Sequence, residues 1–194
     1  MDSVADGKDY TYTLEDHAQR HKDTHFDAPL LNAIVARFKP TSLIDLGCGT
    51  GWYCEAAAKA GVKTVLGVEK TPDIGKLAVF APITVWDLST PLWPLPSHFD
   101  VALCLEVAQY TSPERASFVV QNCCRAGRRV VFSAAPPGQP QPHFGAANAQ
   151  LKPYWIEQFS AAGYAEDSGA SAALRSAARL PHLQVNVMVF QPNA

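Results

Sequence analysis

A loop with three glycines constrains the fold of this chain more than any other feature. Residues 45–51 read DLGCGTG, directly after a short strand-like run over 42–46 and before an alanine-rich, helix-like segment over 52–60. Glycines in such a strand–helix connection permit a tight turn and let a ligand approach the main chain. The loop alone is a weak signal, because an ordinary tight turn has the same composition.

Strand-like and helix-like segments alternate along the rest of the chain. Further strands are predicted over 64–68, 83–86, 99–105, 129–133 and 184–190. Further helices are predicted over 28–38, 73–80, 113–125 and 153–162. Residues 134–152 read as a long loop, and 164–181 are ambiguous, with a strand near Tyr164 and a short helix over 171–179. The alternation predicts an α/β fold with one doubly wound sheet and helices on both faces.

Length and charge limit the organisation and the partners. The 194 residues suit a single domain over 1–194, with 1–27 as an N-terminal lid or substrate segment and 28–194 as the core. The formal net charge of −2 provides no basic field for nucleic acid, so RNA is not favoured as a partner. We expect a monomer or a homodimer.

The cysteines and the apolar runs bear on the compartment. The five cysteines show no CxxC pair and no zinc-finger spacing, which indicates reduced, mostly buried thiols in the cytoplasm and no metal site. Residues 1–17 lack the apolar core of a secretory signal. No apolar run reaches the roughly 18 residues of a membrane span, so we expect no membrane partner.

Acidic residues lie at the ends of three successive predicted strands: Asp45, Glu69 and Asp87. Ligands of doubly wound sheets bind outside the carboxyl ends of the strands, so these carboxylates should surround the glycine loop. Asp45 either caps loop N–H groups or accepts from an ammonium group or a bridging water. Glu69 can accept both hydroxyls of a ribose, and Asp87 can accept from an adenine amino group beside the Leu88 backbone. Trp52 stands where a dinucleotide loop needs its third glycine, which counts against NAD or FAD.

Four segments carry a family resemblance. LIDLGCGTG, VLGVEK, ITVWDLS and FDVALCLEVAQY resemble the first four motifs of class I S-adenosylmethionine-dependent methyltransferases, over about residues 43–132. The resemblance implies a Rossmann-like, seven-stranded sheet whose last strand is antiparallel. It also implies S-adenosyl-L-methionine as methyl donor, S-adenosyl-L-homocysteine as product, and transfer by in-line displacement.

The resemblance further implies the residues that contact the cofactor. Those of the glycine loop and the first three strand ends are Asp45, Gly47, Cys48, Gly49, Gly51, Glu69, Lys70, Asp87 and Leu88. Leu105, Glu106 and Val107, after the fourth strand, would flank the sulfonium. Many relatives continue E-V-x-E-H there, whereas this chain has Gln109 and Tyr110 in place of the acid and the imidazole.

Catalysis requires positioning of donor and acceptor, and a base only if the acceptor must lose a proton. Neither Gln109 nor Tyr110 is a good base near neutral pH, although Tyr110 remains a candidate catalytic residue. In the loop after the fifth strand, His143 is a candidate base or acceptor ligand, or else simply a solvated side chain. Asn148 and Gln150 in that loop are candidate substrate contacts, because some small-molecule methyltransferases similar to this chain carry a His-Asn-Gln-Tyr-Trp series here.

The N-terminal segment is the second candidate for acceptor contacts. Tyr10 and Tyr12 could close over the cofactor. His17, His21 and His25 have the spacing of one helix face. A solvated polar face is the favoured interpretation of this spacing, ahead of a metal site, and His21 on such a face could touch an anionic substrate.

These observations predict a methyltransferase that acts on a small molecule or on an exposed group of a larger one. Two alternatives remain: an RNA methyltransferase of the cap type, and a non-catalytic S-adenosylmethionine-binding partner subunit.

Overall fold

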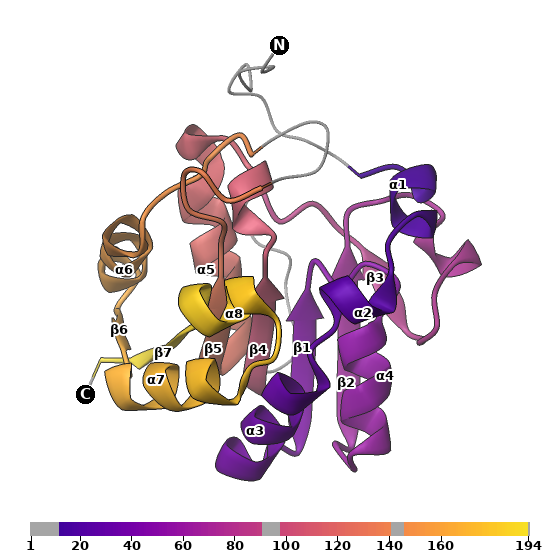
Figure 1. Cartoon of the computed structure of the whole chain (residues 1–194), viewed down its shortest axis with the longest axis horizontal. Helices are drawn as coiled ribbons and strands as arrows, with labels where there is room; N and C mark the ends of the chain where they lie inside the picture. The colour runs from indigo at the N-terminus through magenta and orange to yellow at the C-terminus, as the bar shows by residue number, and fades with distance from the viewer. Residues whose placement is uncertain (1–11, 91–97, 141–145, 194) are drawn as a thin grey trace.

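A seven-stranded sheet with helices on both sides forms the protein (Figure 1). The computed structural model describes residues 12–90, 98–140 and 146–193. The strands are β1 (Ser42–Leu46), β2 (Thr64–Glu69), β3 (Ile83–Val85), β4 (Phe99–Leu105), β5 (Gly127–Ser133), β6 (Tyr164–Glu166) and β7 (Met188–Pro192). The helices are α1 (Leu14–Ala18), α2 (Lys22–His25), α3 (Ala28–Phe38), α4 (Trp52–Lys59), α5 (Ala116–Ala126), α6 (Lys152–Ala161), α7 (Ser168–Ala177) and α8 (Pro181–Asn186).

The order of the strands across the sheet is β3-β2-β1-β4-β5-β7-β6. The first five strands in this order are parallel, and β7 is antiparallel to both β5 and β6. The order reverses between β1 and β4, and such a reversal opens a crevice at the carboxyl ends of the strands. The predicted fold class is confirmed, including the antiparallel last strand.

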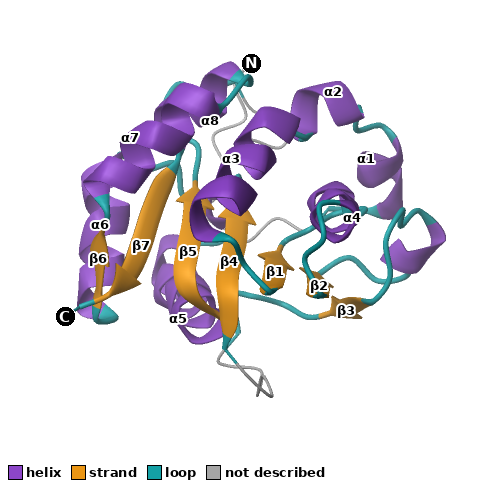
Figure 2. Cartoon of the chain, turned by 90° about the horizontal axis from the view of Figure 1, so that it is seen from below, coloured by secondary structure: helices purple, strands orange, loops and turns teal. Residues whose placement is uncertain are grey.

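Helices cover both faces of the sheet (Figure 2). An apolar layer holds the helices of each face to the sheet. On one face, α3, α4, α7 and α8 pack against side chains such as Leu43 and Leu103. On the other face, α5 and α6 pack against Phe132 and Phe190, with Trp155 fully buried between them. None of the helices in the described residues is long and apolar enough to cross a membrane.

Two predicted elements are wrong. The helix expected over 73–80 is only the 3-10 turn Ile74–Lys76, because Asp73 has a positive φ of 60° and Gly75 and Pro82 disfavour a longer helix. The strand expected over 184–190 is divided between α8 and β7. Pro181 is well placed in the first turn of a helix. Val185 therefore lies in α8, whereas Val189 lies in β7.

The N-terminal segment is fastened to the far end of the chain. Asp27 is fully buried and caps α3 by accepting from the Leu30 N–H at 2.9 Å. It also accepts from the backbone N–H groups of Arg179 and Leu180, each at 2.7 Å. These bonds fix the point from which α1 and α2 extend over the carboxyl edge of the sheet (Figure 1).

Candidate functional site

Four acidic side chains lie at the carboxyl ends of four neighbouring strands and line one cleft. In the spatial order β3-β2-β1-β4 they are Asp87, Glu69, Asp45 and Glu106. Because these strands are parallel, their carboxyl ends meet at the same edge of the sheet. The topology thus gathers residues that lie far apart in the sequence into a single row.

The rest of the cleft comes from the glycine loop, the N-terminal segment and the residues after β4. Its lining also includes Tyr12, His17, Arg20, His25, Gly47, Cys48, Gly49, Thr50, Trp52, Tyr53, Lys70, Leu88, Ser89, Leu105, Val107, Tyr110 and Thr111. Most of the predicted cofactor residues are therefore brought together. The exception is Gly51, which does not line the cleft.

Positive φ angles at all three loop glycines shape the turn: 81° at Gly47, 55° at Gly49 and 90° at Gly51. A side chain at Gly47 would collide with Val107, which packs directly against it. The loop is held down by the Val68 carbonyl, which accepts from the N–H groups of Gly47 and Cys48 at 2.7 and 2.9 Å. Glycine is required here for both backbone conformation and close approach.

The carboxylate of Glu69 accepts several hydrogen bonds from backbone N–H groups of the protein. Its Oε1 accepts from the N–H groups of Lys70 and Thr71 at 2.8 and 3.1 Å, and its Oε2 accepts from the Gly49 N–H at 3.0 Å. Burial alone would favour the neutral acid, but these bonds and the nearby His17 hold the pKa of Glu69 at about 2. Glu69 is thus a fixed anion. Only Oε2 retains capacity for another donor, so the expectation that it accepts two ribose hydroxyls needs modification.

Asp45 has the opposite environment. It is 4% exposed, and the polar contact found for its carboxylate is the Cys54 thiol, 4.0 Å from Oδ2. Burial, assisted by the negative charge of Glu69, raises the pKa of Asp45 to about 7. A buried carboxylate without strong donors is costly unless a ligand supplies a positive or hydrogen-bonding group.

Asp87 is more open to solvent. Its Oδ1 accepts from the N–H and hydroxyl groups of Ser89 at 2.9 and 2.7 Å, and its Oδ2 lies 3.1 Å from the Lys70 ammonium. Although partial burial opposes it, these partners lower the pKa of Asp87. Leu88 follows immediately and is buried at the cleft wall.

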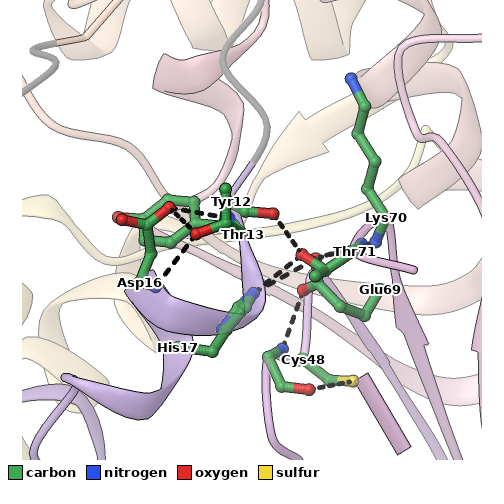
Figure 3. Close-up of polar contacts among 9 residues, drawn as sticks. Tyr12, Thr13, Asp16, His17, Cys48, Glu69, Lys70 and Thr71 are labelled. Carbon is green, nitrogen blue, oxygen red and sulfur yellow. Dashed lines mark hydrogen bonds and ion pairs between the residues drawn. The ribbon is translucent and has the colours of Figure 1, made fainter. Parts of the chain in front are cut away.

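The N-terminal segment closes over this row through His17 and Tyr12. Figure 3 shows His17 pointing from α1 toward Thr71 and Glu69; its Nε2 lies 2.9 Å from the Thr71 hydroxyl and 3.7 Å from Glu69 Oε1. The Thr71 hydroxyl donates to the Tyr12 carbonyl at 2.8 Å. The Tyr12 hydroxyl donates to that of Tyr110 at 3.1 Å, which joins the segment to the region after β4.

The expectation that three histidines share one helix face is wrong. The helix stops after Ala18 and α2 begins at Lys22, so His17, His21 and His25 point in different directions. His17 is buried, His25 lies beside Trp52, and His21 is exposed and does not line the cleft. Across residues 12–90, 98–140 and 146–193, no group of three or more metal-binding side chains is found.

Glu106 is held by side chains that sequence reasoning missed. Asn186 Nδ2 donates to its Oε1 at 3.1 Å, and Gln139 Nε2 donates to its Oε2 at 2.9 Å. Asn186 Nδ2 also donates to the side-chain oxygen Oε1 of Gln139 at 2.8 Å, so the three side chains are mutually hydrogen-bonded. No spacing signal exists for contacts between residues 80 and 33 positions apart.

The remaining predicted acceptor residues lie apart from the cleft lining or beyond the described residues. Asn148 is 1% exposed, and neither end of its side-chain amide has a hydrogen-bond partner among the residues that the structure describes; Gln150 is only partly buried. Tyr10 and His143 lie outside the described residues. Tyr110 does line the cleft, and burial raises the pKa of its hydroxyl, so still less of the basic phenolate form is present near neutral pH.

Comparisons with known proteins agree with this geometry. Residues 44–129 match the family model of a methyltransferase domain. No curated protein matches the chain by sequence. The fold is similar to the sugar N-methyltransferase KedS8 from Streptoalloteichus, with a TM-score of 0.70, 15% identity, and coverage of 100% of this chain and 97% of that one.

Two further structures share the fold. One is the amino pentose methyltransferase CalS10 from Micromonospora echinaspora, bound to S-adenosylmethionine. It has a TM-score of 0.65 and 16% identity, and the match covers 92% of this chain and 94% of that one. The magnesium protoporphyrin IX methyltransferase from Synechocystis has a TM-score of 0.57 and 17% identity, with coverage of 84% and 77%. The matching domain, the seven-stranded topology and the row of strand-end acids together support a class I S-adenosylmethionine-dependent methyltransferase fold for this chain.

Proposed function

We propose that this protein transfers a methyl group from S-adenosylmethionine to a small-molecule acceptor. The observation that carries the proposal is the row of carboxylates around the glycine loop, in one cleft at the switch point of the sheet. We further propose that residues 1–194 act as one domain, that the segment before residue 28 is a lid, and that the protein is cytoplasmic and monomeric or homodimeric.

The residues present fit the cofactor. Asp45, buried and without a strong donor, suits the ammonium group; the open Oε2 of Glu69 suits a ribose hydroxyl. Asp87 and Leu88 suit the adenine, and the N–H groups at the start of α4 suit polar atoms of the ligand. When bound, the cofactor supplies an activated methyl group on a positively charged sulfur.

The protein's own contribution is positioning and exclusion of water. Gly47, Gly49 and Val107 form the floor of the cleft, and Tyr12 and His17 cover it. Holding two reactants in a near-attack geometry supplies much of the rate enhancement for such a displacement. Covering the reacting atoms also strengthens the interaction of the acids with positive charge.

A small acceptor is favoured over RNA. The net charge of −2 gives no general attraction to phosphates, and the cleft itself is lined by four acids. The printed names of similar folds, an amino pentose, a sugar N- and a protoporphyrin methyltransferase, add support for a small acceptor. The replacement of an acid and an imidazole by Gln109 and Tyr110 keeps a non-catalytic binding subunit as the second candidate.

Calorimetric titration tests the proposal. S-adenosylmethionine and S-adenosylhomocysteine should bind, NAD should not, and Asp45→Ala and Glu69→Ala should each weaken binding at least about tenfold. Glu114→Ala, on an exposed turn, is the matched control. The absence of binding would refute both candidates. A screen of metabolites and RNA with labelled methyl donor then separates the enzyme from the binding subunit.

A further inference from the structure

Glu106 stands at the end of the acidic row where the acceptor has to approach. The three other acids, at the ends of β3, β2 and β1, match the adenine, ribose and ammonium groups in the proposed function. Glu106 follows β4, on the side of the cleft toward β5, and Val107 beside it packs on the first loop glycine. The part of the cofactor nearest this fourth carboxylate is then the sulfonium, from which the methyl group passes to the acceptor.

The position of Glu106 is fixed in both backbone and side chain. Its φ of 56° lies in the left-handed region, which costs free energy for a residue with a side chain. Its N–H is anchored by the carbonyl and hydroxyl oxygens of Ser133 at 2.9 and 3.0 Å. Both carboxylate oxygens are held by the amides of Asn186 and Gln139. Strain that the surroundings hold in place at a cleft points to a functional role.

The groups that hold Glu106 do not neutralise it. Amide N–H donors orient a carboxylate but carry no net charge. None of the ion pairs formed among the described residues involves Glu106. Its charge reaches into the cleft, where it contributes to the raised pKa of Tyr110. Among the described residues no cation pairs with Glu106, so its carboxylate presents a fixed negative charge to the cleft.

We propose that Glu106 makes the protein an N-methyltransferase, whose acceptor is a small amine bound beside this carboxylate. In the transfer, the lone pair of the neutral amine nitrogen forms the new N–C bond. The C–S bond breaks and its electron pair stays on sulfur. The positive charge passes from sulfur to nitrogen, and the ammonium product later releases a proton to water.

A fixed carboxylate favours methyl transfer to an amine and disfavours transfer to an oxyanion. It accepts a hydrogen bond from an N–H of the neutral amine before the reaction and stabilises the positive charge as it moves onto nitrogen. An acceptor that attacks as an oxyanion would instead bring a second negative charge next to Glu106, and Coulomb repulsion would raise the barrier. The inference rests on the proposed function, because it takes the methyl donor as given.

Three ligands test the charge preference at this position. S-adenosylhomocysteine is uncharged at sulfur, S-adenosylmethionine carries the sulfonium, and sinefungin places a protonated primary amine where the transferred methyl group would be. In calorimetry at pH 7, Glu106→Gln should weaken sinefungin binding about tenfold or more, but S-adenosylhomocysteine binding less than about threefold. Loss of S-adenosylmethionine affinity should be intermediate. Glu114→Gln, outside the cleft, should leave all three unchanged.

A second variant guards against misfolding. Gln139→Ala leaves Glu106 in place but frees its Oε2, and should weaken sinefungin selectively and by a smaller factor. Equal losses for all three ligands would overturn the inference, since Glu106 would then be only structural. Equal losses for the two charged ligands would overturn it too, because Glu106 would then recognise the donor.

The acceptor itself gives an independent result. A methylated amine in the metabolite screen supports the inference, and a methylated hydroxyl or carboxylate overturns it. If the wild-type protein binds none of the three ligands, the proposed function and this inference fall together. Binding of S-adenosylhomocysteine with no selective effect of Glu106→Gln refutes the inference alone.

Discussion

The imidazole Nε2 of His17 lies 2.9 Å from the hydroxyl oxygen of Thr71, although 54 positions separate the two residues. His17 is 3% exposed and Thr71 is 1% exposed, so the contact is shielded from water. The same hydroxyl lies 3.1 Å from Glu69 Oε1. A residue of the N-terminal segment is therefore linked through Thr71 to the carboxylate we assign to the ribose, and closure of the segment is coupled to that part of the site.

Removal of this contact should open the segment. We expect His17→Ala to weaken S-adenosylhomocysteine binding about tenfold, because loss of a buried hydrogen bond costs about 1–1.5 kcal/mol. Hydrogen exchange of the amides around α1 should become faster in the ligand-free variant. His21→Ala removes an exposed imidazole from the same segment and serves as the control. Unchanged exchange in His17→Ala would show that other contacts hold α1.

Cofactor binding should release a proton near neutral pH. Asp45, with its pKa of about 7 in the ligand-free protein, is half protonated there. An ammonium group beside it favours the ionised form, so affinity should rise with pH, by up to about tenfold per unit below pH 7, and level off above it. Calorimetry in buffers of different ionisation enthalpy measures the released proton. A pH-independent affinity in the wild type would contradict this assignment.

Asp45→Asn provides the control, and folding gives a second readout. The unfolded carboxyl has an ordinary pKa near 3.8, so between about pH 4 and 7 the folded protein binds more protons than the unfolded chain. The free energy of unfolding of the ligand-free protein should therefore fall as pH rises across this range. In Asp45→Asn, both this contribution to the slope and the proton release on binding should vanish.

The sequence is sufficient to predict the row Asp45, Glu69 and Asp87, because each acid lies at or near the carboxyl end of its own strand. Parallel pairing then brings the strand ends together without any further information. The glycine loop is predictable for the same reason: turn, strand and helix are contiguous in sequence. Local patterns therefore specify the cofactor half of the cleft.

The acceptor half depends on contacts that no local pattern encodes. The amides that hold Glu106 come from Asn186 in α8 and Gln139 in a loop, and α8 itself was taken for part of a strand. His17 was predicted on a polar face and is instead buried against Thr71. Such pairings follow from tertiary packing, which overrides short-range periodicity.

Asp27 should be one of the most sensitive polar positions in the protein. Asp27→Ala leaves three N–H groups without their acceptor: those of Leu30 and Leu180, which are buried, and that of Arg179, which is partly buried. We expect the free energy of unfolding in urea to fall by about 3–5 kcal/mol. Asp167→Ala removes a cap that accepts only from the Ala170 N–H, at 2.8 Å, and should cost about 1 kcal/mol. Similar losses in both variants would contradict the structural role of Asp27.

Substitution by alanine should lower the free energy of unfolding by different amounts at two strand glycines, because the added Cβ would meet different atoms. A Cβ at Gly127 would lie 2.6 Å from the Ala102 backbone nitrogen, whereas one at Gly67 would meet the Cys48 sulfur at 2.8 Å. Backbone in the middle of a sheet cannot move away, but a thiol can rotate. We therefore expect Gly127→Ala to cost about 3 kcal/mol or more and Gly67→Ala about 1–2 kcal/mol in urea denaturation.

Gly67→Ala should also weaken S-adenosylhomocysteine binding, because the displaced Cys48 belongs to the glycine loop. The second substitution Cys48→Ala removes the colliding sulfur and should recover most of both losses. Gly75→Ala, where nothing lies within 4 Å of the added carbon, should change stability by less than about 0.5 kcal/mol. If Cys48→Ala rescues stability but not binding, the sulfur contributes to the cofactor site itself, and the loop responds to more than steric displacement.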